Sequence, residues 1–170
     1  FFKAVNVIEP SLIRVESDES TYDFHIMLRV EIESKLIDGS LKVKDLPEMW
    51  NNQMRKYLNL EVPDDSVGVL QDIHWSGGQF GTFCNYTIGN VMAAQLMKQM
   101  HKDDSNIKSS LEAANYEPTL DWLKNNIHQH GRRYSRNELL KRSTGRSLDA
   151  KPYLEYLQNK ASEVYGIKFN

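Results

Sequence analysis

Residues 68–81 read Gly68-Val69-Leu70-Gln71-Asp72-Ile73-His74-Trp75-Ser76-Gly77-Gly78-Gln79-Phe80-Gly81. The segment places an amide, a carboxylate, an imidazole and an indole beside four glycines, which are too many for the interior of a helix. Polar side chains on a tight loop between rigid elements commonly direct chemistry into a cleft. A surface turn with a buried Trp75 is the alternative that the spacing leaves open. The segment contains no metal-ligand spacing, phosphate loop or Gly-x-Ser-x-Gly motif.

The composition is that of one globular region. The 170 residues are 40% hydrophobic and 26% charged, which is enough for one core and too little for two comfortable ones. A net charge of -2 provides no basic field, so we expect neither a nucleic-acid partner nor a membrane partner. The single cysteine, Cys84, excludes an internal disulfide and suits a reducing, cytoplasmic location. The first residue is Phe1 rather than Met, which is typical of the interior of a longer polypeptide.

The spacing of apolar residues predicts helices along most of the chain. They are expected at 1–8, 17–37, 46–60, 82–100, 106–114, from Pro118 to a stop at Gly131, at 135–142, and after a cap at Asp149. Residues 11–15 are expected to form a connector or a short strand. Asp45 is a predicted cap, and Ser135 with Glu138 has the spacing of a capping box. Strand signals are weak, so the sequence predicts a single all-α region, residues 1–170, with irregular connectors.

The helix predicted at 17–37 is apolar on more than one side, so we expect it to lie between other elements. It carries His25 and Arg29 one turn apart, which could face a cleft. A hydrogen-bonded core histidine and a solvated arginine are the favoured interpretation of this pair. Asp64 and Asp65 are interpreted as part of a solvated loop, because a calcium loop needs more oxygen ligands at regular spacing.

Three segments carry a resemblance to a known family. They are Ile13-Arg14-Val15-Glu16-Ser17-Asp18, residues 68–75, and Gly81-Thr82-Phe83-Cys84-Asn85-Tyr86-Thr87-Ile88-Gly89-Asn90. They resemble successive signatures of the carboxypeptidase Taq family of zinc metallocarboxypeptidases, and the resemblance extends from Phe1 to about Tyr165. It implies an almost wholly helical fold and a hydrolase that removes single residues from peptide C-termini.

The resemblance covers only the C-terminal third of the family pattern. The family binds zinc through the two His of a His-Glu-x-x-His helix and a downstream Glu, and the Glu of that motif activates water. This sequence has no His-Glu-x-x-His segment. We therefore expect no metal ligands and no bound zinc in this chain, and an upstream, zinc-binding half of the same protein as its partner.

The resemblance also implies roles for individual residues. Arg14 matches an arginine that pairs with the terminal carboxylate of the substrate, and the planar fork of a guanidinium suits both oxygens. His74 is the candidate to stabilise the oxyanion or position the substrate, and Asp72 the candidate to orient an imidazole. The hydroxyl of Tyr86 can donate to a carboxylate or a developing oxyanion. The candidate catalytic residues are therefore His74, Tyr86 and Asp72, and the candidate substrate-binding residues are Arg14, Tyr86, Gln71 and Trp75.

Four positions depart from the family signatures. Ser17 replaces an alanine, which adds a hydroxyl. Next to Tyr86, Thr82, Cys84 and Asn85 replace Tyr, Pro and Thr. These changes bear on the shape of the subsites, on the preference at S1′ and on activity itself.

Three functions are compatible with the sequence. The favoured one is the C-terminal segment of a metallocarboxypeptidase that acts on peptide C-termini. The second is a non-catalytic, all-α interaction module that descends from the same family. The third, an unrelated helical domain, conflicts with the three signatures. Because the helix at 17–37 and Phe1-Phe2 leave apolar surface without cover, we also expect a homodimer or a large apolar groove.

Overall fold

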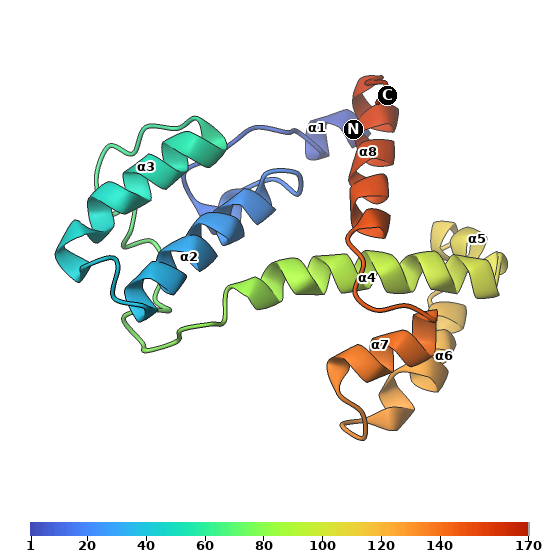
Figure 1. Ribbon diagram of the computed structural model, residues 1–170. Coiled ribbons are helices and arrows are strands. Elements are labelled where there is room, and N and C mark those ends of the chain that lie inside the picture. Colours follow the sequence, from blue (N-terminus) through green and yellow to red (C-terminus); the bar gives the residue numbers. More distant parts are fainter. Residues whose placement is uncertain (170) are drawn as a thin grey trace. The chain divides into compact units, whose positions relative to one another are not determined.

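The computed structural model describes residues 1–169, and this range folds into helices and irregular connectors without a strand (Figure 1). The α-helices are α1 (Phe2–Val5), α2 (Tyr22–Ile37), α3 (Leu46–Leu58), α4 (Cys84–Asp103), α5 (Asn106–Glu112), α6 (Glu117–Asn126), α7 (Arg136–Thr144) and α8 (Lys151–Tyr165). The 3-10 helices are η1 (Arg14–Glu16), η2 (Val43–Asp45) and η3 (His128–His130). The predicted all-α architecture is confirmed.

The chain forms two compact units, Phe1–Thr87 and Ile88–Asn170. The first turn of α4 belongs to unit 1 and the rest of that helix to unit 2. That the two units make a single region stays a prediction. None of the described helices is both long and apolar enough to cross a bilayer.

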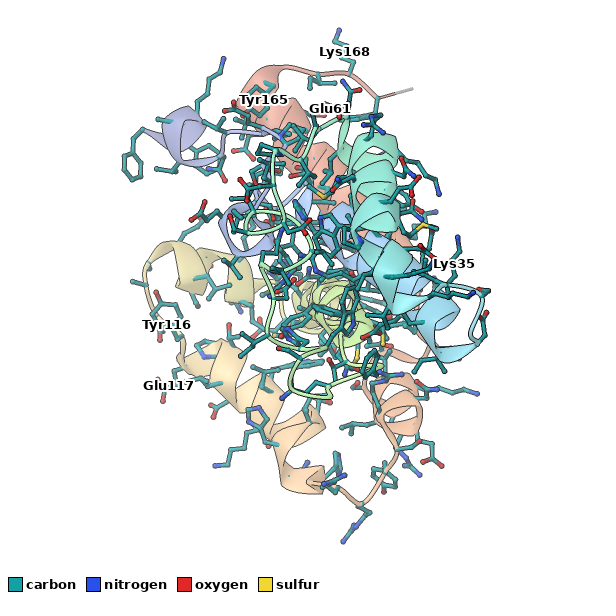
Figure 2. All side chains as sticks on the ribbon, turned by 90° about the vertical axis from the view of Figure 1, so that its left-hand side faces the viewer. Lys35, Glu61, Tyr116, Glu117, Tyr165 and Lys168 are labelled. Carbon is teal, nitrogen blue, oxygen red and sulfur yellow. The ribbon has the colours of Figure 1, made fainter. Side chains whose placement is uncertain are left out.

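The core of unit 1 lies where α2 packs against α3 (Figure 1). Figure 2 shows Lys35, near the end of α2, and Glu61, just past α3, at opposite ends of this pair, as antiparallel helices require. The buried cluster consists of Leu28, Ile32, Leu41, Trp50, Met54, Leu58 and Val69. Burial of an apolar side chain of this size contributes about 1.5–3 kcal/mol. The packing of α2 against α3 therefore fixes the position of the polar residues of α2.

The segment after α3 turns back onto this core. Asn59 ends α3 in the left-handed region, with φ 56°, and Val69 is buried. Between them the chain approaches itself closely at Gly68. A Cβ atom there would lie 2.7 Å from Cγ1 of Val62 and 3.0 Å from the carbonyl oxygen of Asp64, so only glycine fits. The turn places Gln71 and Asp72 next to α2, where both bond to Arg29.

Unit 2 has a smaller core formed by Met100, Ile107 and Trp122. Its polar interior is organised by Gln95, which is buried. The amide nitrogen donates to Oγ1 of Thr144 and to the carbonyl of Ser147, both at 3.0 Å, and Oε1 accepts the amide of Asp149 at 3.1 Å. This one side chain holds the connector between α7 and α8 against α4.

Some helix ends follow their local sequence signals. Ser135 and Glu138 form the predicted capping box of α7. The N-cap of α8 is Ala150, one residue after the predicted Asp149, whose Oδ1 still accepts the amide of Lys151 at 2.9 Å. The prediction for Asp45 is wrong, because its side chain makes no capping hydrogen bond. The chain before Asp45 is already turned as η2, which leads directly into α3.

Other predicted boundaries differ from the structure. The helix expected at 1–8 is reduced to α1. Residues 11–15, expected as a connector or a short strand, form a connector that turns into η1 at Arg14. The helix expected to reach Gly131 stops at Asn126, since Ile127 leaves the helical region with φ −127° and η3 follows. The turn at Arg14 is the one that affects the functional site.

Candidate functional site

Two arginines of unit 1 share one carboxylate. Nε and Nη2 of Arg14, which lies in η1, donate to Oδ1 of Asp72 at 3.1 and 2.7 Å. Nε of Arg29, on α2, donates to Oδ2 of the same carboxylate at 2.6 Å. The exposed fractions of the three side chains are 8%, 0% and 10%. One nearly buried carboxylate thus faces two guanidiniums, and its two oxygens are divided between them.

Each of the three pKa values reflects this arrangement. Burial favours the neutral form of Asp72, but the hydrogen bond of Arg14 and the charge of Arg29 outweigh it and hold the pKa below its usual range. Burial lowers the pKa of Arg29 to about 10, against the opposing charge of Asp72. Burial acts in the same direction on Arg14, yet its bond and charge contact with Asp72 leave that pKa raised. All three groups are charged at neutral pH.

The side-chain amide of Gln71 joins the same two arginines. Oε1 accepts the backbone amide of Arg14 at 2.9 Å and Nη2 of Arg29 at 2.8 Å. Nε2 donates to three backbone carbonyls at 3.0–3.1 Å. The predicted contact between Gln71 and substrate therefore has no free polar group to support it. Gln71 instead ties the loop to η1 and α2.

Arg14 keeps donors that no residue within 1–169 uses. Besides the bonds to Asp72, Nη1 donates to Oη of Tyr22 at 3.0 Å. A guanidinium has five N–H donors, so these bonds leave one N–H on each terminal nitrogen. The central carbon of the guanidinium lies 5.2 Å from the ring centroid of Tyr86 and 5.8 Å from that of Phe83. The structure thus brings Arg14 and Tyr86 together, while their roles stay predictions.

His74 lies beside Tyr86 and packs against the aromatic rings of Phe83 and Tyr86. Nε2 of His74 is 3.3 Å from Oη of Tyr86, and its ring centroid is 4.4 Å from that of Phe83. Nδ1 lies 3.8 Å from Oδ1 of Asp72, which is too long for a hydrogen bond. The sequence suggested that Asp72 orients an imidazole. In the structure, Asp72 makes no hydrogen bond to the imidazole of His74. Its oxygens are taken by the two arginines.

Trp75 is a packing residue in this structure. Its ring makes edge contacts with Trp50 and Phe83, with centroids 6.1 and 5.9 Å apart. Its indole nitrogen donates to Oε1 of Glu33 at 2.9 Å. Because the only polar atom of the side chain is already bonded, the predicted substrate contact of Trp75 has no polar support.

Sequence reasoning missed several members of the cluster. The favoured interpretation of Arg29 as a solvated side chain is wrong, because the residue is fully buried. Glu33, also buried, lies one turn further along α2. An arginine and a glutamate four positions apart in an apolar helix are a signal that could have identified both. Tyr22 and Phe83 carried no comparable signal.

His25 occupies the same face of α2 and is fully buried. Neither ring nitrogen meets full hydrogen-bond geometry with a described residue, although the backbone of Ser11 lies close enough to oppose the lowering of the pKa. Burial lowers the pKa of His25 to about 4 from a usual 6.5, and the charge of Arg29 adds to the effect. The imidazole is therefore neutral in the folded protein well below the pH at which it would be protonated in the unfolded chain.

We expect this histidine to make the protein sensitive to mild acid. Between pH 6.5 and about 4 the unfolded chain binds a proton that the folded state does not, so stability falls as pH falls through that window. The loss attributable to His25 is about 3 kcal/mol. In urea unfolding at pH 7 and pH 4, the His25→Leu variant should show a smaller difference than the unvaried protein. His101→Gln, at an exposed position, is the matched control, and equal pH dependence in all three would contradict the assignment.

Within residues 1–169 there is no group of three or more His, Cys, Asp or Glu side chains that could hold a metal ion. Structural and catalytic zinc sites use at least three protein ligands of these types. The described residues therefore do not fit a zinc ion by themselves.

Comparisons with known proteins agree over nearly the whole chain. A family model described as Carboxypeptidase Taq (M32) metallopeptidase matches residues 1–161. Thermostable carboxypeptidase 1 of Thermus thermophilus is 42% identical over 166 residues, which cover 98% of this chain and 32% of that protein. Carboxypeptidase 1 of Bacillus subtilis is 40% identical over 165 residues, which cover 97% of this chain and 33% of that protein.

A solved structure shows the same fold. The crystal structure of the M32 carboxypeptidase from Deinococcus radiodurans R1 matches with a TM-score of 0.93 at 39% identity, over 96% of this chain and 33% of that chain. The chain spans about a third of the length of the curated relatives that it matches. The chain belongs to the Carboxypeptidase Taq (M32) metallopeptidase family.

Proposed function

We propose that this chain is the C-terminal segment of a zinc-dependent metallocarboxypeptidase that removes single residues from peptide C-termini. The observation that carries the proposal is the pair of Arg14 N–H groups that no described residue binds, next to the partly exposed Tyr86. A nearly buried guanidinium with free N–H donors suits a carboxylate. The relatives are named carboxypeptidases, which supports the same conclusion.

Three side chains have separate roles in this proposal. The two unused N–H groups of Arg14 bind the terminal carboxylate of the peptide, and Asp72 holds the guanidinium in place. Oη of Tyr86 donates to that carboxylate or to the developing oxyanion. His74, 3.3 Å from this hydroxyl, orients it or shares the oxyanion contact. The described residues supply binding and orientation, and the zinc ligands belong to the upstream part of the protein.

The surface near the site supports an upstream partner. Leu70 and Ile73 are 71% and 80% exposed, although they flank Gln71 and Asp72, which are largely enclosed. Apolar side chains gathered at such a point suit contact with another polypeptide. We assign that contact to the upstream half of the same protein, because the chain spans only a third of its relatives. A homodimer and a cytoplasmic location are further parts of the proposal.

The test uses the longer polypeptide that carries this chain and its upstream part. With zinc supplied, we expect it to release the last amino acid from an N-blocked peptide with a free C-terminus. The same peptide with an amidated C-terminus should release nothing, because it lacks the charge that Arg14 recognises. Cleavage of internal bonds, or release from both peptides, would contradict the proposal. Binding of the free peptide without hydrolysis would favour the non-catalytic interaction module instead.

A further inference from the structure

Glu33 bridges two separate points of the loop that carries His74. Oε1 accepts the indole N–H of Trp75 at 2.9 Å, and Oε2 accepts the backbone amide of Gly81 at 3.1 Å. The glutamate is 6% exposed and lies on α2 within unit 1. Both oxygens of one buried carboxylate are thus used to hold the two ends of the segment 76–80.

The segment between these two points is internally ordered. The amide of Gln79 donates to the carbonyl of His74 at 2.8 Å, and the amide of Gly77 donates to the carbonyl of Ile73 at 2.9 Å. At the far end, Gly81 has φ +72°, a conformation that L residues rarely adopt. Because the loop holds its own shape, attaching it at two places sets its position on α2 as a whole.

The two ends of the loop are close in sequence to His74 and to Tyr86. His74 precedes Trp75 in the sequence, and Gly81 is followed closely by Phe83, which packs on the His74 ring, and by Tyr86. The distance of 3.3 Å between Nε2 of His74 and Oη of Tyr86 therefore depends on where both ends are held. Glu33 contacts both ends.

Arg14 is held by other means. Its guanidinium is bonded to Asp72 and its backbone amide to Gln71, and Glu33 takes no part in these bonds. The site therefore has two supports, one for the carboxylate-binding arginine and one for the His74–Tyr86 pair. We propose that Glu33 is a positioning residue that sets the geometry of His74 and Tyr86, while Asp72 and Gln71 hold Arg14 independently. The proposal rests on the proposed carboxypeptidase activity.

Replacing Glu33 with Gln should separate the two kinetic constants. The amide retains one acceptor oxygen but presents an NH₂ group to the second N–H, so one of the two loop attachments is lost. In the longer polypeptide, we expect kcat to fall about 10–100-fold, because small displacements of catalytic groups have effects of that size. KM should change less than kcat, because Arg14 keeps its bonds to Asp72 and Gln71. If Glu33 only supported folding, its replacement would reduce the amount of active protein and leave the kcat and KM of the folded fraction unchanged.

The position of the loop also has a readout that needs no catalysis. The indole N–H of Trp75 and the backbone amide of Gly81 should both give protected NMR signals in the unvaried protein. In Glu33→Gln, the one that loses its acceptor should become exposed and shifted. Glu31→Gln is the matched control, because Glu31 lies on the same helix and accepts Nε2 of Gln53 at 2.7 Å and the hydroxyl of Tyr57, both on α3. This control should leave kcat and the Trp75 signal unchanged.

Trp75→Phe keeps an aromatic ring but removes the bonded N–H together with the five-membered ring of the indole, so it tests the same attachment if Glu33→Gln does not fold. It should lower kcat in the same direction, with KM nearly constant. Unchanged kcat in a folded variant of either kind, or an equal rise in KM, would overturn the assignment. If the unvaried polypeptide releases no amino acid, the proposed function fails, whereas unaltered signals of both Trp75 and Gly81 in Glu33→Gln would refute the role of Glu33 alone.

Discussion

Replacing Asp72 with Asn is expected to lower the free energy of unfolding by about 3–5 kcal/mol, because the change leaves two buried guanidiniums without a counter-charge. Arg14 and Arg29 both bond to this carboxylate, and their side chains are 8% and 0% exposed. The measurement is urea unfolding at pH 7. Asp65→Asn is the control, since Asp65 is exposed and lies in the turn that precedes the loop.

A change below about 1 kcal/mol, the range of surface ion pairs, would show that the cluster is solvated and not buried as described. The pH dependence gives an independent check. Since the pKa of Asp72 is lowered by folding, its contribution is complete above the usual value of 3.8 and is lost as pH falls through the folded value. The Asp72→Asn variant should therefore lose the part of acid denaturation that lies below about pH 4.

Replacing Arg14 with Met should weaken the binding of a peptide with a free C-terminus by about 2–5 kcal/mol, because a desolvated charge pair is lost. Binding of the same peptide with an amidated C-terminus should change little, since it offers no carboxylate. Titration calorimetry on the longer polypeptide measures both peptides with one preparation. A partial loss of folded protein lowers the measured binding of both peptides equally, so it does not change the ratio of their affinities.

Arg55→Met serves as the control for loss of a guanidinium, because Arg55 is exposed and pairs with Glu61 at the end of α3. Both peptides should bind this variant as they bind the unvaried protein. If Arg14→Met weakens both peptides equally, Arg14 supports the structure and does not recognise the carboxylate.

The all-α class and several helix ends could be predicted because their causes are local. The capping box at Ser135 and Glu138 is encoded within four residues, and the packing stripe of α3 repeats at the helical period. The end of α6 at Asn126 was missed because Ile127 leaves the helix without any glycine or proline to signal it. The turn at Arg14 was missed because its cause is distant, since Gln71 binds its backbone amide.

The sequence predicted which residues form the candidate site better than it predicted the hydrogen bonds between them. The loop motif identified Asp72 and His74, and the resemblance identified Arg14 and Tyr86. Which carboxylate pairs with which cation depends on tertiary contacts. Asp72 bonds to Arg14, 58 positions away, instead of to His74, two positions away. Arg29 and Glu33 were left out for the same reason, because a charged residue in a helix reads as solvated until its partner is known.

The most direct test of the carboxylate site is a crystal structure of the longer polypeptide with a peptide product bound. We predict that the terminal carboxylate lies about 3 Å from the terminal nitrogens of Arg14 and within hydrogen-bond distance of Oη of Tyr86. Arg14 should keep its bonds to Asp72 in that complex. A product whose carboxylate binds elsewhere, with Arg14 bonded only to Asp72 and Tyr22, would contradict the assignment.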